Sequence, residues 1–187
     1  DKLKELESKC IQEEDPWCNA MCPIHIDGRQ LCKLVAKGDF TEGRKIYEKK
    51  VVFPNIVSRV CEEKCKSQCK RKELGNSINI RQLELSCMNY GKEVKTRVLL
   101  KPKKKEKVII FGTSLSGLSC ALELKNKGYS VDLYEDKDIL GKNVYETYKD
   151  ILEEDIIKKD LQKVENAGIK IYLNYSFRSE EHTSELQ

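Results

Sequence analysis

The chain has 187 residues, enough for one large domain or two small ones. Its 35 Lys and Arg residues exceed its 31 Asp and Glu residues by only four, an excess too small to indicate a nucleic-acid partner. We find no secretory signal and no apolar run of membrane-spanning length, so we expect a cytoplasmic protein without a membrane span. In that setting nine cysteines favour metal ligands or reactive thiols over a disulfide framework.

Composition divides the chain near a basic stretch, residues 101–107. Eight of the nine cysteines precede this stretch, and an apolar, strand-like run follows it at residues 108–111. Its lysines have no aromatic residues between them, so we interpret it as a solvated linker rather than a nucleic-acid patch. We therefore expect one domain over residues 1–100 and a second over residues 108–177.

In the first region, the apolar residues of 31–37 and of 43–47 recur at helical spacing, and Gly38 lies between the two segments. In the second region we expect helices over about 116–127 and 148–167, which alternate with strands over 108–111, 130–135 and 169–174. Alternation of strands and helices predicts a parallel, doubly wound sheet. The expected fold class is a mainly α domain followed by a truncated α/β, Rossmann-like βαβ unit.

The last ten residues, 178–187, resemble the in-frame translation of a common sequencing adapter at all ten positions. A chance match of that length is improbable, so we treat this segment as a non-native tail and leave it out of the fold. Without the tail, His25 is the only histidine. We expect it to be a partly exposed residue beside the cysteines rather than a general base.

Six cysteines fall in two groups with metal-ligand spacing: Cys10, Cys18 and Cys22, then Cys61, Cys65 and Cys69. The spacings of four in the second group place its thiols on one face if that segment is helical. Thiolates bind both zinc and iron–sulfur clusters, and a cysteine followed by proline, as at Cys22, is typical of cluster-binding loops. Spacing favours iron–sulfur clusters over a zinc site or unligated thiols. We expect Cys32 and Cys120 to be core cysteines, since both lie in apolar helical stretches.

A glycine-rich turn follows the first expected strand, from Gly112 to Gly117, and Glu135 closes the next strand. This is the context of a dinucleotide fingerprint, in which helix N–H groups face a pyrophosphate and the acidic residue binds ribose hydroxyls. Ser114 replaces the second glycine of the fingerprint. A later glycine pair is reduced to Gly141-Lys142, and we expect Lys142 to restrict a loop that needs positive φ. The alternative is a Rossmann-like unit that binds no nucleotide.

Taken together, these motifs resemble the N-terminal iron–sulfur domain of the glutamate synthase small (β) subunit. That domain is shared with dihydropyrimidine dehydrogenase and related NAD(P)H-dependent flavoprotein reductases. The resemblance rests on residues 15–27, 58–61, 69–71 and 78–84 and extends over about residues 5–177. In that family an FAD-binding Rossmann unit follows directly, as it does here. The resemblance implies a fragment that passes electrons between FAD and [4Fe-4S] clusters toward an electron-accepting subunit or domain.

The same resemblance implies two [4Fe-4S] clusters whose ligands interleave along the chain. The ligands implied for the first cluster are Cys22, Cys61, Cys65 and Glu84. Those implied for the second cluster are Cys10, Cys18 and Cys69. Glu13 stands where the family has a further cysteine, and a carboxylate matches cluster iron less well than a thiolate, so we expect this cluster to be labile or incomplete. We expect Cys87 to pack in the core rather than to supply the absent ligand.

For the Rossmann unit, the resemblance favours FAD over NAD(P). The residues expected to contact the flavin nucleotide are Gly112, Ser114, Gly117, Glu135 and Gly141. NAD(P)H is expected to bind in a C-terminal part that this fragment lacks, so the fragment alone is expected to be inactive. The alternative, from a different class, is a non-redox, metal-stabilised interaction module with a non-binding Rossmann-like unit.

Overall fold

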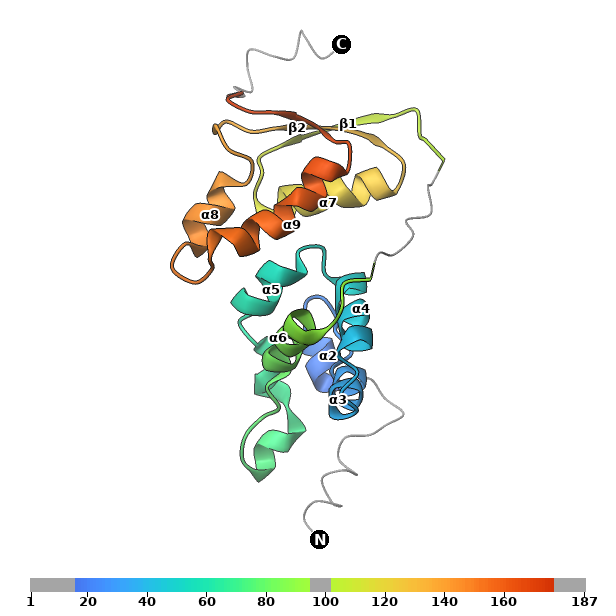
Figure 1. The fold of residues 1–187 in the computed structure, drawn as a ribbon, viewed down its shortest axis with the longest axis vertical. Helices are drawn as coiled ribbons and strands as arrows, with labels where there is room; N and C mark the ends of the chain where they lie inside the picture. The colour runs from blue at the N-terminus through green and yellow to red at the C-terminus, as the bar shows by residue number, and fades with distance from the viewer. Residues whose placement is uncertain (1–15, 95–101, 177–187) are drawn as a thin grey trace. The chain divides into compact units, whose positions relative to one another are not determined.

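The computed structural model describes residues 16–94 and 102–176. The chain divides into two compact units, residues 1–95 and residues 96–187 (Figure 1). The expected ligand Cys10, the substituted position Glu13 and the adapter-like tail lie outside the described residues. Over the two described ranges, no helix has the length and apolar character needed to cross a bilayer.

The first unit is helical. Its helices are α2 (Trp17–Met21), α3 (Gly28–Ala36), α4 (Phe40–Lys50), α5 (Pro54–Val60) and α6 (Ile80–Tyr90). The longer helices begin at side-chain caps, because Asp27, Asp39 and Asn79 each accept a backbone N–H three residues ahead. Gly38 adopts a φ of +73° between α3 and α4, which confirms the expected break between two helices.

Two clusters of buried side chains hold these helices together. The first contains Ile26, Tyr47, Val51 and Met88. The second contains Leu31, Ile80 and Cys87. Cys87 is fully buried, which confirms its expected packing role. The α4 and α6 helices approach closely at Gly43, where a Cβ would lie 2.5 Å from the Cys87 sulfur, so only a glycine fits there.

The segment that carries three of the expected ligands is not one α-helix. Cys61 caps the end of α5, Cys65 lies in the 3-10 turn η1 (Lys64–Gln68), and Cys69 separates η1 from a second turn, η2 (Lys70–Leu74). A 3-10 turn has about three residues per turn, so a spacing of four does not align side chains along it. The three thiols were expected on one face only if this segment formed an α-helix, and it does not.

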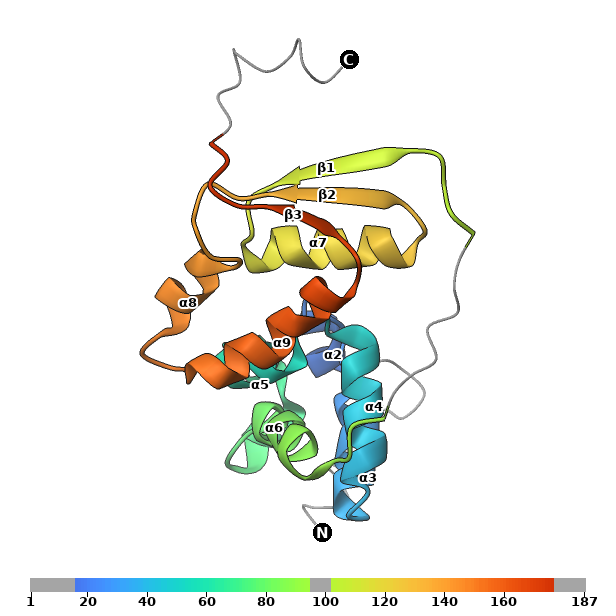
Figure 2. The same ribbon diagram turned by 45° about the horizontal axis from the view of Figure 1, so that its top comes forward.

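The second unit is a three-stranded parallel sheet with helices between its strands. Its elements are β1 (Lys107–Phe111), α7 (Leu115–Asn126), β2 (Ser130–Tyr134), α8 (Lys142–Tyr148), α9 (Glu154–Asn166) and β3 (Lys170–Tyr172). The strand order is β1-β2-β3, with both neighbouring pairs parallel. The helices lie on one face of the sheet (Figures 1 and 2). The expected fold class, a mainly α region followed by a Rossmann-like unit, is confirmed.

Several expectations for this unit are wrong. Its helices lie on one face of the sheet, so the described part is not doubly wound. The helix expected over 148–167 begins later, because the chain turns after Tyr148, buries Leu152 and starts α9 at Glu154, and the separate helix α8 before this turn was not expected. Glu154 and Asp155 in the first turn of α9 favour a helix start there. Cys120 is exposed on α7 rather than buried in the core.

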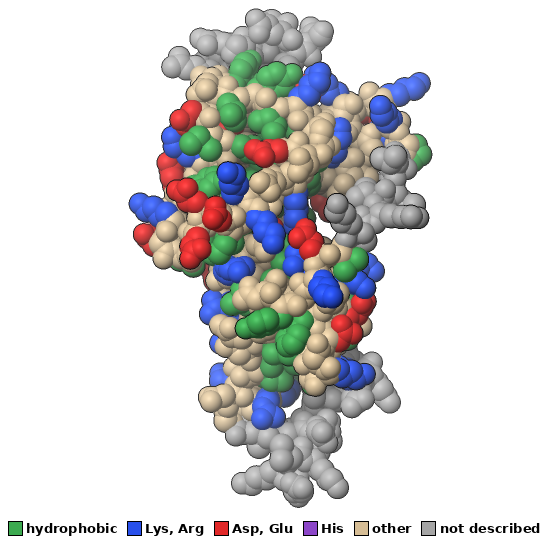
Figure 3. Space-filling model, in the orientation of Figure 1, with side chains coloured by type: hydrophobic (Ala, Val, Ile, Leu, Met, Phe, Trp, Pro, Cys, Tyr) green, Lys and Arg blue, Asp and Glu red, His purple; other side chains and the backbone are tan. Residues whose placement is uncertain are grey.

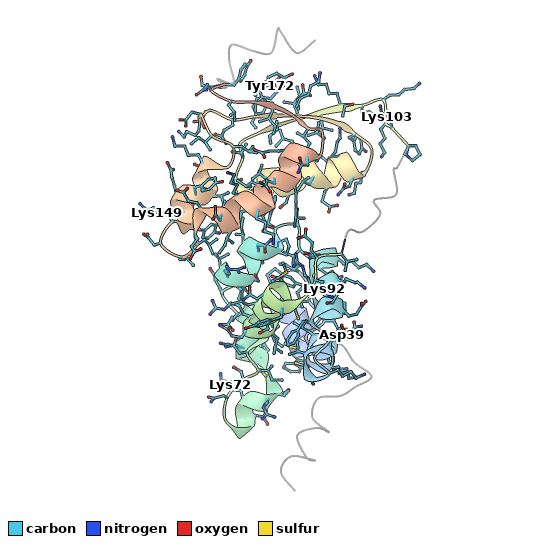
Figure 4. The ribbon with its side chains drawn as sticks, in the orientation of Figure 1. Asp39, Lys72, Lys92, Lys103, Lys149 and Tyr172 are labelled. Carbon is cyan, nitrogen blue, oxygen red and sulfur yellow. The ribbon has the colours of Figure 1, made fainter. Side chains whose placement is uncertain are left out.

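The face of the sheet away from the helices carries aromatic side chains near the strand ends. Phe111, Tyr134 and Tyr172 are register neighbours across the three strands, and the rings of Tyr134 and Tyr172 stack at 4.6 Å. Tyr172 lies on this outer face (Figure 4). Lys107 pairs with the buried Asp132 carboxylate at 2.7 Å. On the side of the molecule drawn in Figure 3, basic and acidic side chains are interspersed.

The close approach at Gly43 generates a testable prediction. Gly43→Ala should destabilise the chain by roughly 1–2 kcal/mol, because the overpacking against Cys87 outweighs the helix propensity gained. Adding Cys87→Ala should recover most of that loss by removing the sulfur. Urea unfolding under reducing conditions measures both effects. A Gly43→Ala chain as stable as the parent would show that α4 and α6 do not pack this closely.

Candidate iron-sulfur and nucleotide sites

A cavity of about 330 Å³ lies within the helical unit, between α2, α5, η1 and α6. Four of its lining residues are the ligands implied for the first cluster: Cys22, Cys61, Cys65 and Glu84. Cys18 also lines it. Most of the remaining wall is apolar and includes Val57 and Ile80. Residues more than sixty positions apart in the sequence thus meet around one cavity.

Local backbone geometry places these side chains. Cys22 follows α2 directly and precedes a tight turn in which the His25 N–H bonds to the Cys22 carbonyl at 2.9 Å. Glu63 adopts a φ of +55° between α5 and η1, and its N–H points to the Cys61 sulfur at 3.4 Å. Hydrogen bonds of this kind are among the means by which a protein tunes a cluster thiolate. Sequence reasoning did not identify Glu63.

Three acidic groups around this cavity, Cys61, Cys65 and Glu84, have raised pKa values and are hard to ionise as they stand. Burial, then the neighbouring Cys61 and other acidic groups, raise the pKa of the Cys65 thiol to about 11. Burial and the nearby Glu63 raise the pKa of Glu84 to about 7, against a lowering by a hydrogen bond from Tyr47. Burial also raises the pKa of Cys61. A cationic iron centre would remove this penalty by replacing protons, so the donor set fits such a group.

A second, smaller cavity of about 120 Å³ adjoins the first. Its cysteines are Cys18, Cys32, Cys65 and Cys69. Cys18 and Cys69 are two of the thiols implied for the second cluster, and the Ile78 N–H points to the Cys69 sulfur at 3.5 Å. Cys32 was expected to be a core cysteine. It packs against the Leu31, Ile80 and Cys87 cluster, yet it is only half-buried and also faces this cavity.

The glycine-rich turn of the second unit has the backbone that a dinucleotide fingerprint requires. Gly112 has a φ of +90°, and a Cβ on Gly117 would lie 2.3 Å from the Gly112 carbonyl oxygen, so neither position accepts a side chain. Ser114 caps α7, and its Oγ accepts the Gly117 N–H at 3.4 Å. Its exposed hydroxyl therefore takes a helix N–H that a phosphate would otherwise use.

Glu135 is nearly fully buried, at 2% exposure, and serves the turn itself. Its carboxylate accepts the Thr113 N–H at 2.8 Å, the Thr113 hydroxyl and, at 3.2 Å, the Lys137 N–H. The Gly141 N–H in turn donates to the Thr113 Oγ1 at 2.9 Å. The carboxylate expected to bind ribose is thus bonded inside the protein. Sequence reasoning missed Thr113, which links the two loops.

The expectation that Lys142 restricts a loop with positive φ is wrong. Gly141, with a φ of +70°, supplies the left-handed residue, and Lys142 begins α8. The Lys142 ammonium pairs with Asp138, in the loop before α8, at 2.8 Å. A glycine at position 142 would therefore lose an ion pair and helix propensity without relieving any strain.

Thiols and a carboxylate around two adjoining cavities, followed by a parallel βαβ unit with a glycine-rich turn, define an iron–sulfur protein joined to a nucleotide-binding domain. Residues 2–96 match the family described as dihydropyrimidine dehydrogenase domain II, 4Fe-4S cluster, and the chain belongs to this family. Residues 110–166 match the NAD(P)-binding Rossmann-like domain.

Related proteins agree with this assignment. The chain is 32% identical, over 63% of its length, to the NADPH-Fe(3+) oxidoreductase subunit beta of Geobacter sulfurreducens, covering 18% of that protein. It is 26% identical, over 89% of its length, to the glutamate synthase [NADPH] small chain of Bacillus subtilis, covering 36% of it. The corresponding chain of Azospirillum brasilense is 22% identical over the whole length, with 40% covered. The chain therefore spans less than half of these relatives.

The buried network around Thr113 generates a testable prediction. Thr113→Val keeps the shape but removes the hydroxyl, leaving Glu135 without one donor and the Gly141 N–H without its acceptor. We expect a loss of about 1–3 kcal/mol in the free energy of unfolding of this unit. Thr113→Ser should retain more of the stability because it keeps the hydroxyl. Urea unfolding compares the three chains, and equal stability of Thr113→Val and the parent would contradict the network.

Proposed function

We propose that this chain is the electron-transfer part of an NAD(P)H-dependent iron–sulfur flavoprotein oxidoreductase, with two [4Fe-4S] clusters in the helical unit and FAD on the Rossmann unit. When bound, the clusters supply one-electron transfer and the flavin supplies hydride chemistry. The observation that carries the proposal is that Cys22, Cys61, Cys65 and Glu84 surround one cavity. The proposed domains are residues 1–100 and 108–177, with residues 101–107 as linker.

The arrangement of these donors supports a cluster over a single zinc ion. A zinc ion needs about four ligands that converge within about 2.3 Å of one point. Among the described residues, no three His, Cys, Asp or Glu side chains form such a group. The thiols instead line the wall of a cavity of about 330 Å³, as the ligands of a multi-atom centre do.

The chain's own residues then have separable tasks. Cys22, Cys61 and Cys65 hold the first cluster, and Glu84 supplies the fourth ligand atom. The apolar wall keeps water away, which sets the local dielectric, while the Glu63 N–H bonds to a ligand sulfur. In the adjoining cavity, Cys18 and Cys69 would hold the second cluster together with Cys10.

The Rossmann unit is proposed to bind FAD at Gly112, Ser114, Gly117, Glu135 and Gly141. Support comes from the positive φ of Gly112, the glycine-only contact at Gly117 and the exposed start of α7. The unit follows the cluster domain directly, as in the flavoprotein family that the motifs resemble. Binding at Glu135 would require ribose hydroxyls to take over bonds now made by Thr113.

Partner and nicotinamide binding are proposed for the longer protein. Several relatives are named as NADPH-linked subunits, and this chain spans 18% to 40% of three of them. We assign the NAD(P)H site to sequence beyond this chain, and the electron acceptor to a partner subunit or domain.

The metal content tests the cluster assignment. Anaerobic reconstitution with iron and sulfide should load about eight iron atoms per chain, with little zinc. Ser substitution at Cys22, Cys61 or Cys65 should remove one cluster, seen as loss of roughly half the iron and of the matching visible absorbance. Cys120→Ser is the matched control and should lose nothing, because that thiol is exposed in the other unit. A colourless, folded chain with stoichiometric zinc would overturn the proposal in favour of a non-redox module.

Flavin affinity tests the nucleotide assignment separately. Ser114→Ala frees the Gly117 N–H but keeps the Cβ, whereas Ser114→Gly removes both obstacles. We expect FAD affinity to rise from the parent to Ser114→Ala to Ser114→Gly, by about thirtyfold in total, as each of the two relieved contacts is worth on the order of 1 kcal/mol. Titration followed by flavin fluorescence gives the dissociation constants. If neither variant shifts them, FAD is not held at this turn.

A further inference from the structure

We propose that Cys32 is the fourth thiolate ligand of the second cluster, in place of the cysteine that the family has where this chain has Glu13. The inference rests on the proposed function, because it requires a cluster in the smaller cavity. Its basis is placement: Cys32 lines that cavity together with Cys18 and Cys69. Seven cysteines and Glu84 would then supply eight ligands, four for each cluster.

The geometry of α3 directs Cys32 toward the other thiols. Gly28 and Cys32 are four residues apart on this helix and share one face. Side chains on a helix lean toward its N-terminus, so the Cys32 side chain leans over Gly28. A Cβ on Gly28 would lie 3.8 Å from the Cys18 sulfur. The same Cβ would lie 3.1 Å from the Ile80 Cδ1, so the Cys18 sulfur and the Ile80 side chain both lie close to the face of α3 that carries Cys32.

Cys32 is less buried than a cysteine that only packs in the core. Cys87, in the same helical unit, is completely buried, whereas Cys32 is half-buried, as are Cys18 and Cys69. Cys32 thus has the same environment as the two ligands implied beside it. Arg29 also lines this cavity, and a cationic side chain favours thiolates near it.

Donor chemistry favours Cys32 over Glu13. Thiolate is the softer donor and the usual ligand of cluster iron, whereas a carboxylate is hard. Cys65 also lines the smaller cavity, but it stands with Cys61 and Glu84 around the larger one and is needed there. Cys32 is therefore the remaining cysteine of the smaller cavity, and we assign it as the fourth ligand of the second cluster.

The full chain, reconstituted anaerobically with iron and sulfide, tests this ligand. Cys32→Ser should lose roughly half of the iron and sulfide and one of two electron paramagnetic resonance signals of the reduced protein. Adding Glu13→Cys, which restores the family's own ligand position, should recover the lost cluster. Glu13→Ala alone should change nothing, because the parent does not depend on that carboxylate. Cys120→Ser serves as the control for loss of a thiol outside the site.

Each alternative result has a distinct meaning. A Cys32→Ser chain that keeps two clusters overturns the Cys32 ligand while leaving the proposed function intact. Iron loss on Glu13→Ala assigns the ligand to Glu13 and also overturns it. A loss in Cys32→Ser that Glu13→Cys does not repair points to a packing defect and overturns it as well, with far-ultraviolet circular dichroism reporting the defect. A parent chain that takes up no iron contradicts the proposed function itself.

Discussion

The helical unit is organised around four thiols and one carboxylate that its fold brings to a single cavity. Cys18, Cys22, Cys61, Cys65 and Glu84 line one largely apolar cavity. Burial and mutual repulsion raise the pKa of Cys65 to about 11 and that of Glu84 to about 7. A folded chain keeps such an arrangement only at a cost in stability, and a bound cation offsets that cost. The apolar wall, the turns at His25 and Glu63, and the caps of α3 and α6 all serve this arrangement.

Much of the fold could be predicted because it rests on local signals. Periodic apolar residues, Gly38 and the alternation of strands and helices identified α3, α4 and the Rossmann-like unit, since these features act within a few residues. Helix α8 and the turn before α9 were missed because that turn includes Leu152, whose burial is a tertiary contact. Cys120 was expected to be buried because its sequence neighbours are apolar, but its own position on α7 faces solvent.

The candidate site also combines features that could be predicted from the sequence with features that could not. Residue types and the family resemblance anticipated which side chains share the larger cavity, although the assumed helix through Cys61, Cys65 and Cys69 is replaced by 3-10 turns. The role of Thr113 could not be predicted, because its hydroxyl meets Glu135 and the Gly141 N–H only after two loops have come together. Cys32 was expected in the core because its sequence neighbours are apolar, and it does pack against the core cluster, but it is half-buried and also lines the smaller cavity, which depends on how α3 packs against the other elements.

The two cavities also explain why the cysteines interleave along the chain. Cys18, Gly28, Cys65 and Ile80 line both cavities, so one thin layer of side chains separates them. Cys18, near the start of α2, lines both cavities, whereas Cys22, just after the helix, lines only the larger one, so the two fall in different proposed ligand sets. In the turns after α5, Cys69 lines only the smaller cavity, whereas Cys65 lines both. If two clusters bind side by side as proposed, cysteines that are close in the sequence must point into different cavities, and one short segment can then supply ligands to both.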